Sequence, residues 1–206
     1  MREITKIMKG WEFTGPDGTT TTVDLPHTWN ARDGQDGGND YWRGTCIYRT
    51  RFAAPQFNTA SHQVWIQFDG VNASAHVVLN GSPVCNHDGG YSTFRANITE
   101  LLRDENELTV EVDNSKNDRV YPQKADFTFY GGIYRDVELV VTGRTAVSPL
   151  YLGSDGVLVH PQAVDSLSVS GEAEIHLVSK EGNACMVTLD IAAPDGRPVF
   201  SKRQRA

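Results

Sequence analysis

The chain has 206 residues, which corresponds to about one and a half domains at the usual ~150 residues per domain. It carries 19 Lys and Arg against 26 Asp and Glu, so its net charge is −7. A nucleic-acid binder needs a basic surface, and a membrane span needs ~20 consecutive apolar residues. The sequence has neither feature, so we expect a soluble globular protein that binds no nucleic acid and no membrane.

The first residues read Met-Arg-Glu-Ile-Thr-Lys and lack the apolar stretch and small-residue cleavage site of a secretory signal. We therefore expect a cytoplasmic protein. The three cysteines, Cys46, Cys85 and Cys185, are widely spaced and lie in apolar or strand-like runs. This spacing indicates neither a disulfide framework nor a zinc motif, so we expect free, buried thiols.

Apolar residues alternate with period two along much of the chain, which is typical of strands with one buried face. Strands are predicted at residues 48–52, 64–68, 75–79, 83–85, 108–113 and 137–141. Asn80-Gly81 supplies the positive φ angles of a type I′ turn, so the third and fourth of these strands should form a hairpin. The only helix expected is about one turn at residues 98–102. Many short strands joined by Gly, Asn and Asp turns predict an all-β jelly-roll sandwich.

The strand pattern restarts after Gly143, with candidate strands at residues 157–161, 171–178, 186–191 and 198–200. An immunoglobulin-like sandwich takes ~100 residues, and roughly sixty follow Gly143 in this sequence. We therefore predict two domains, a jelly roll over residues 1–143 and an incomplete immunoglobulin-like domain over residues 144–206.

A glycine-rich stretch over residues 30–44, the first segment, combines carboxylates and amides with aromatic side chains. Aromatic faces stack on the C–H face of a sugar ring while Asp and Asn bind its hydroxyls, so this segment is a candidate carbohydrate site. The alternative is a surface crossover whose Asp and Asn side chains cap turns. Composition alone leaves both interpretations open.

The second segment, residues 121–136, places Asp126 before an aromatic cluster and the pair Gly131-Gly132. Consecutive glycines let the backbone approach a neighbour or a ligand closely. Asp126 either binds a ligand or caps the turn. For Arg135 we expect a structural role, as an ion pair or in hydrogen bonds to loop carbonyls.

An ordered series of motifs between Trp11 and Leu139 resembles the N-terminal domain of glycoside hydrolase family 2, and its β-galactosidase branch in particular. The residues that carry the resemblance are Leu25-Pro26-His27-Thr28-Trp29-Asn30, Asp33-Gly34-Gln35-Asp36-Gly37-Gly38 with Tyr41, Arg43 and Gly44, Phe68-Asp69-Gly70-Val71, Val78-Leu79-Asn80-Gly81, His87-Asp88-Gly89-Gly90-Tyr91-Ser92-Thr93-Phe94, Asn106-Glu107-Leu108 through Val112-Asp113-Asn114, and Gly131-Gly132-Ile133-Tyr134-Arg135-Asp136.

The resemblance implies a sugar-binding jelly roll, then an immunoglobulin-like domain, then a (β/α)8 barrel that holds the catalytic carboxylates. It also implies that Asp126 reaches the barrel's pocket to hold a terminal galactose, and that it is a sodium ligand in the full enzyme. Asp36 and Asn39, with Asp33 as an alternative, are the candidates of the first segment for the same pocket. The chain itself is expected to hold no metal or cofactor, whereas the full-length enzyme would use Na or Mg.

No residue of this chain is assigned to catalysis. Asn106-Glu107 matches the Asn-Glu pair of the family's acid/base, but it lies at the entry of a predicted strand, where the family has a turn, so we expect a structural role. The six histidines are scattered without ligand spacing and are expected to be solvated or hydrogen-bonded.

We therefore expect the N-terminal part of a family 2 exo-glycosidase, foremost a β-galactosidase that removes terminal β-galactosides. It would be inactive alone because both catalytic glutamates belong to the barrel. Its partners would be a galactoside or related oligosaccharide, the barrel and, in the full-length enzyme, further copies of itself. The alternatives are a stand-alone carbohydrate-binding module and the corresponding part of a β-glucuronidase or β-mannosidase of the family.

Overall fold

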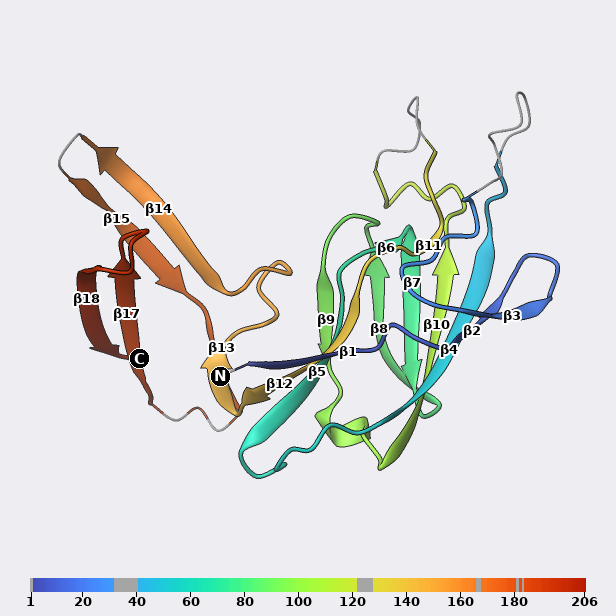
Figure 1. Cartoon of the computed structure of the whole chain (residues 1–206), viewed down its shortest axis with the longest axis horizontal. Coiled ribbons are helices and arrows are strands. Elements are labelled where there is room, and N and C mark those ends of the chain that lie inside the picture. The colour runs from blue at the N-terminus through green and yellow to red at the C-terminus, as the bar shows by residue number, and fades with distance from the viewer. Residues whose placement is uncertain (1, 32–40, 122–127, 166–167, 181, 183) are drawn as a thin grey trace.

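The computed structural model describes the chain except for residues 1, 32–40, 122–127, 166–167, 181 and 183. The described residues form β-strands and a single 3-10 turn, η1 (Thr99–Leu101), which lies where the helical turn was predicted (Figure 1). The prediction of an all-β protein is therefore confirmed. In the part of the chain that the structure describes, no helix has the length and apolar character needed to cross a membrane.

One layer of the sandwich is a four-stranded antiparallel sheet in the order β1-β12-β5-β9. Its strands are β1 (Glu3–Lys6), β12 (Val137–Gly143), β5 (His62–Phe68) and β9 (Phe94–Asn97). Phe68 lies opposite Val137 on one side and Phe94 on the other. The register therefore aligns apolar residues of three strands on the face that meets the second layer.

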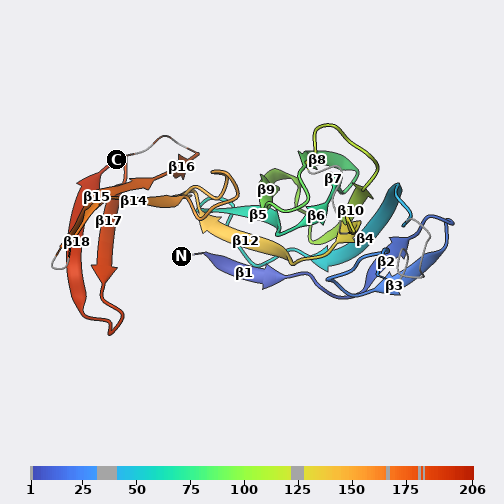
Figure 2. The same ribbon diagram turned by 90° about the horizontal axis from the view of Figure 1, so that it is seen from above.

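The other layer is a six-stranded antiparallel sheet in the order β3-β2-β4-β10-β7-β8 (Figure 2). Its strands are β3 (Thr20–Val23), β2 (Trp11–Thr14), β4 (Thr45–Ala53), β10 (Glu105–Asp113), β7 (Ser74–Leu79) and β8 (Ser82–Asp88). In the central strand β10, Leu108, Val110 and Val112 are buried while Glu107 and Glu111 are exposed. This is the alternation that the sequence predicted.

The main hydrophobic core lies between the two layers. Val64, Ile66 and Phe68 of β5 belong to the same buried cluster as Val110 of β10 and Tyr48 of β4. Each of these five side chains is at most 1% exposed. Burial of apolar surface contributes roughly 25 cal/mol per Å², so this cluster is the main stabilising feature of the sandwich.

The predicted Asn80-Gly81 hairpin is present between β7 and β8. Asn80 and Gly81 have φ angles of 54° and 80°, as a type I′ turn requires. A further pair of short strands, β6 (Val71–Asn72) and β11 (Gly132–Ile133), lies at the opposite end of the sandwich from this turn (Figure 1).

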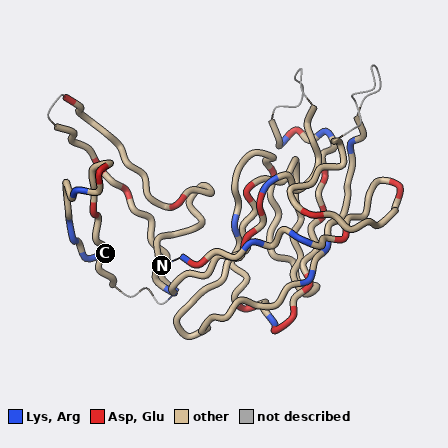
Figure 3. The backbone as a smooth tube through the Cα atoms, in the orientation of Figure 1, with Lys and Arg blue, Asp and Glu red and all other residues tan. Residues whose placement is uncertain are grey.

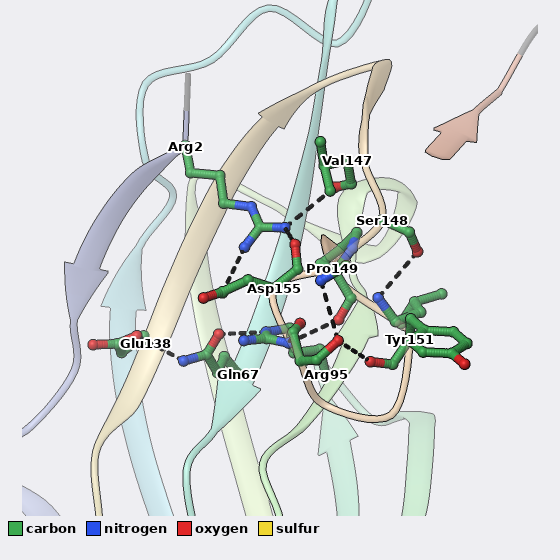
Figure 4. A network of polar contacts seen from close by, with 12 residues as sticks. Arg2, Gln67, Arg95, Glu138, Val147, Ser148, Pro149, Tyr151 and Asp155 are labelled. Atoms are coloured by element: carbon green, nitrogen blue, oxygen red, sulfur yellow. Dashed lines mark hydrogen bonds and ion pairs between the residues drawn. The ribbon is translucent and has the colours of Figure 1, made fainter. Parts of the chain in front are cut away.

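Val64, Ile66 and Phe68 of β5 share a buried face, as the alternation predicted, but the opposite face of the strand is not solvated. Trp65 and Gln67, which point away from the core, are also buried. The stretch that follows β13 (Thr145–Val147) covers part of this face, because Arg95 of β9 donates 2.9 Å hydrogen bonds to the carbonyl oxygens of Pro149 and Ser154. Figure 4 shows how Arg95 also donates to Gln67, which in turn donates to Glu138.

Residues after Gly143 form three two-stranded antiparallel ladders (Figure 2). These ladders pair β13 (Thr145–Val147) with β16 (Leu177–Ser179), β14 (Val157–Val164) with β15 (Val169–Ile175), and β17 (Met186–Ala192) with β18 (Pro198–Arg205). Each predicted strand of this part is present. The division at residue 143 and the immunoglobulin-like character of residues 144–206 stay predictions.

The three cysteines are free, as expected. Only Cys46 is fully buried, whereas Cys85 and Cys185 are half-buried. Burial raises the pKa of the Cys46 thiol to about 12 and that of Cys85 to about 11. Neither thiol is therefore suited to nucleophilic chemistry near neutral pH.

Candidate functional site

The side chains predicted to bind a sugar, Asp36, Asn39 and Asp126, lie outside the described residues, as does Asp33. The described residues on either side of them define where the two segments leave the sandwich. Both segments leave it at the same end, near β6 and β11 (Figure 1). The geometry of this end is set by contacts among the flanking residues.

Asn30 connects the first segment to the second. Its side chain is completely buried. Its Nδ2 donates to the carbonyl oxygen of Trp42 at 2.9 Å, and this bond joins the two described ends of the first segment. Its Oδ1 accepts from the backbone N–H of Gly131 at 2.7 Å, in the second segment.

Asn114 directly follows β10 and is the second member of what we call the asparagine pair, Asn30 and Asn114. Its Nδ2 donates to Asn30 Oδ1 at 3.0 Å and to the carbonyl oxygen of Phe129 at 3.3 Å. Its Oδ1 accepts from the N–H of Gly44 at 2.9 Å. Two buried amide side chains therefore hold both described ends of the first segment against the second.

An aromatic and cationic layer lies beside the asparagine pair. The Arg43 guanidinium carbon is 4.7 Å from the ring centroid of Tyr41 and 5.2 Å from that of Phe129. The Tyr41 hydroxyl accepts hydrogen bonds from Arg43 and, at 3.2 Å, from the backbone N–H of Phe129. Cation–π contacts of this kind contribute ~0.5–1 kcal/mol at exposed sites and more when desolvated. They form a second link between the two segments.

The predicted tight packing of the glycine pair is confirmed. A Cβ atom on Gly131 would lie 2.1 Å from the Trp29 ring, and one on Gly132 would lie 2.5 Å from the carbonyl oxygen of His27. Gly132 also has a φ angle of 134°, which disfavours other residues. The glycines therefore let the second segment lie directly on residues 27–29.

A small cavity of about 20 Å³ lies within this end, and its lining comes from six separate stretches of the chain. The lining includes Arg43, Asn72, Tyr91, Asn114 and Phe129. Its volume suits one water molecule, which needs ~10–15 Å³, and is too small for a sugar ring. A sugar would therefore have to bind outside this cavity.

Exposed aromatic side chains occur around this end of the sandwich. Trp42, Tyr91, Tyr121 and Tyr130 are 38%, 48%, 87% and 40% exposed, respectively. Aromatic rings that remain accessible beside polar segments are the usual elements of a carbohydrate-binding surface.

The prediction for Arg135 is confirmed. Its Nη1 donates at 3.3 Å to the carbonyl oxygens of Asp69 and Tyr91. Next to it, Asp136 pairs with Lys6. Arg135 therefore fastens the end of the second segment to neighbouring loops, and Asp136 fastens it to strand β1.

An acidic cluster that the sequence did not indicate lies beside this ion pair. Single carboxylate oxygens of Asp69, Asp136 and Glu138 lie within 4.8 Å of one another. Gln67 donates to Asp69 and Glu138, at 2.8 and 2.9 Å. Burial and then the nearby Asp69 charge raise the pKa of Glu138. These contacts explain the cluster without a metal ion.

Glu107 lies in β10 and pairs with Arg51 of β4 at 3.0 Å, which fits the structural role expected for it. His27 is half-buried, with Nδ1 2.8 Å from the Tyr48 hydroxyl, and burial lowers its pKa. The His87 ring stacks on Phe94 at 4.1 Å. Both imidazoles pack against aromatic rings, as hydrogen-bonded structural histidines do.

Comparison with known proteins gives this geometry a context. Residues 10–143 match the family described as "Glycosyl hydrolases family 2, sugar binding domain". A β-glucuronidase of Bacteroides fragilis is 36% identical over 191 residues, which are 91% of this chain and 27% of that protein. Two solved structures are also similar over almost the whole chain.

The first is an FMN-binding β-glucuronidase from Faecalibacterium prausnitzii L2-6, which is 37% identical in sequence and superposes with a TM-score of 0.91. The match covers 99% of this chain and 32% of the β-glucuronidase chain. The second, described as a putative β-galactosidase from Bacteroides fragilis, is 32% identical in sequence and has a TM-score of 0.90. That match covers 100% of this chain and 33% of the other chain. The chain therefore spans about a quarter to a third of the length of these relatives.

Proposed function

The chain belongs to glycoside hydrolase family 2 through its sugar-binding domain, and from this premise we propose that it forms the N-terminal part of an exo-glycosidase and contributes to its substrate pocket. The observation that carries the proposal is the asparagine pair. It holds the polar first segment against the second, so that side chains far apart in sequence can act on one ligand.

In this proposal Asp126, Asp36 and Asn39 bind hydroxyl groups of the terminal sugar. Carboxylate and amide oxygens are suited to this task because each can accept hydrogen bonds from neighbouring hydroxyls. The exposed rings of Trp42 and Tyr130 would offer an apolar wall to the C–H face of a sugar. Asp126 would also supply an oxygen ligand for sodium.

The bond-breaking groups lie elsewhere in the protein. A retaining glycosidase uses two carboxyl groups ~5 Å apart, one as nucleophile and one as acid/base. We assign this pair to a barrel domain that works together with this chain, because Glu107, the only Asn-Glu glutamate of the chain, is paired with Arg51. Residues 1–206 alone are therefore expected to be inactive.

Two sugars are candidates for the terminal residue. Of the three relatives described above, the two with higher identity are named β-glucuronidases, which favours β-glucuronides. The structure described as a putative β-galactosidase supports the β-galactosides expected from the sequence. A glucuronide carries a carboxylate at C5 of the sugar and a galactoside carries a hydroxymethyl group. The residues that contact this substituent therefore decide between the two substrates.

The direct test compares nitrophenyl β-glucuronide and nitrophenyl β-galactoside as substrates of the complete native polypeptide that includes residues 1–206. We expect hydrolysis of one of them with enzyme-like turnover, and none by residues 1–206 alone. Turnover by residues 1–206 alone would contradict the proposal. So would calorimetric saturation of residues 1–206 by sub-millimolar sugar, which would instead indicate a self-sufficient carbohydrate-binding module.

A further inference from the structure

Strand β10 has a buried asparagine at each end. Asn106 is its second residue and Asn114 directly follows it, and both are 2% exposed. Each is hydrogen-bonded to a second asparagine: Asn80 donates to Asn106 at 2.9 Å, and Asn114 donates to Asn30 at 3.0 Å. The two pairs lie roughly 27 Å apart, at ~3.4 Å per strand residue.

The pairs differ in what they hold together. Asn106 bonds to Arg103 and Phe52 near the β7–β8 turn, at the end of the sandwich away from both segments. The asparagine pair instead bonds to Trp42 and Gly44 of the first segment and to Phe129 and Gly131 of the second. A buried amide without its partners is costly, so such a pair favours one arrangement of the backbone around it.

We infer that Asn30 and Asn114 are positioning residues for the glycoside site. They fix residues 42–44 of the first segment to residues 129–131 of the second, and so set where the two segments leave the sandwich. The inference rests on the proposed function and adds residues that need not touch the sugar. It implies that a substitution that displaces the backbone of one segment also displaces the backbone of the other, because both are bonded to the asparagine pair.

Hydrogen exchange on residues 1–206 tests the structural part of the inference without any substrate. The backbone N–H of Phe129 donates to the Tyr41 hydroxyl, and that of Gly44 donates to Asn114 Oδ1. Neither amide donates to Asn30, so removing the Asn30 side chain deletes neither of these two hydrogen bonds directly. In Asn30→Ala we expect both amides to exchange about tenfold faster or more, beyond any change in global stability. Asn106→Ala is the matched control and should leave both amides unaffected after the same correction.

Unchanged exchange of Phe129 and Gly44 in Asn30→Ala would overturn the inference, and so would an equal acceleration in Asn106→Ala. If Asn30→Ala does not fold, Tyr41→Phe replaces it. That variant removes only the hydroxyl that accepts from Phe129 and Arg43. Gly131 donates to Asn30 and not to this hydroxyl, so the expected result is faster exchange of the Gly131 amide, and unchanged exchange there would count equally against the inference.

Kinetics of the complete polypeptide test the functional part. Asn30→Ala and Asn114→Ala should each lower kcat/KM by about tenfold to a hundredfold, because a displacement of ~1 Å in a substrate-positioning group has effects of this size. The double variant should lose little more than either single one, since both break the same unit. Asn106→Ala should lower Tm to a similar degree but keep kcat/KM within about twofold of wild type, below the Tm of every variant.

Equal losses of kcat/KM in Asn106→Ala and Asn114→Ala would show a general effect of lost stability and would contradict the positioning role. The two arms also separate this inference from the proposed function. A wild-type polypeptide without glycosidase activity would refute the proposed function, whereas the exchange experiment would still decide whether the asparagine pair couples the segments.

Discussion

At the scale of single residues, Asn30 shows how a short polar side chain can organise a site that it need not touch. It is completely buried and bonds to Trp42, Gly131 and Asn114. An asparagine can donate two hydrogen bonds and accept two, so it satisfies backbone groups from separate segments at one point. Neither Asp nor Leu, the closest residues in size, offers that combination.

His27 leads to a prediction about pH. Burial lowers its pKa below the ordinary value of ~6.5, so folding favours the neutral imidazole over the protonated one. As pH falls through ~6.5 the unfolded chain takes up this proton first, and stability decreases until the folded-state pKa is reached. An NMR titration of the His27 ring protons should give a midpoint below 6.5, and a midpoint at or above that value would contradict the burial seen here.

Glu107 gives a prediction about catalysis. Glu107→Gln removes the ion pair with Arg51, and because both side chains are exposed we expect a stability loss below ~1 kcal/mol. In the complete polypeptide kcat/KM should stay within about twofold of wild type, whereas loss of a general acid/base reduces rates by ~10²–10⁴-fold. A loss of that size would show that Glu107 takes part in the reaction.

At the scale of elements, Gly81 of the β7–β8 turn and Gly132 of β11 allow the cost of backbone strain to be separated from that of steric overlap. Gly81 has a φ angle of 80° and open space where a Cβ would lie. Gly132 has a φ angle of 134°, and its Cβ would meet His27 and Tyr48 atoms at 2.5 and 2.9 Å. Gly81→Ala should therefore cost ~1–2 kcal/mol from backbone strain alone, and Gly132→Ala ~3 kcal/mol or more because overpacking adds to strain.

Urea unfolding of both variants measures these free energies. Equal destabilisation by Gly81→Ala and Gly132→Ala would mean that the second segment does not lie against residues 27 and 28 as described.

The elements also show what could be predicted from the sequence. Asn80-Gly81 and the alternation of Leu108, Val110 and Val112 predicted the β7–β8 hairpin and the buried face of β10 correctly, because both signals are local. The burial of Trp65 was not predictable, since alternation says which residues share a face but not what covers it. The asparagine pair was missed because its members are 84 residues apart and only the topology brings them together.

At the scale of the whole molecule, apolar exposure is uneven. Of the fifteen exposed large hydrophobic side chains among the described residues, ten lie after residue 149. They include Val159 of β14 and Val199 and Phe200 of β18, at 67%, 60% and 46% exposed. Such faces, next to unpaired strand edges, favour association.

Residues 1–206 on their own should therefore self-associate as their concentration rises. Light scattering checks this directly, and Val159→Lys with Val199→Lys should shift the chain toward the monomer because charges block edge pairing. A clean monomer at high concentration in the unmodified chain would contradict the expectation.

The central claim is that this chain supplies substrate-binding groups to a family 2 glycosidase. The most direct test is kcat/KM of Asp126→Ala in the complete polypeptide, measured on whichever nitrophenyl glycoside the wild type hydrolyses. We expect a loss of at least about a hundredfold with an unchanged Tm, because a group that holds the sugar contributes to transition-state binding. A value of kcat/KM equal to that of the wild type would contradict the claim and leave Asp126 as a turn-capping residue.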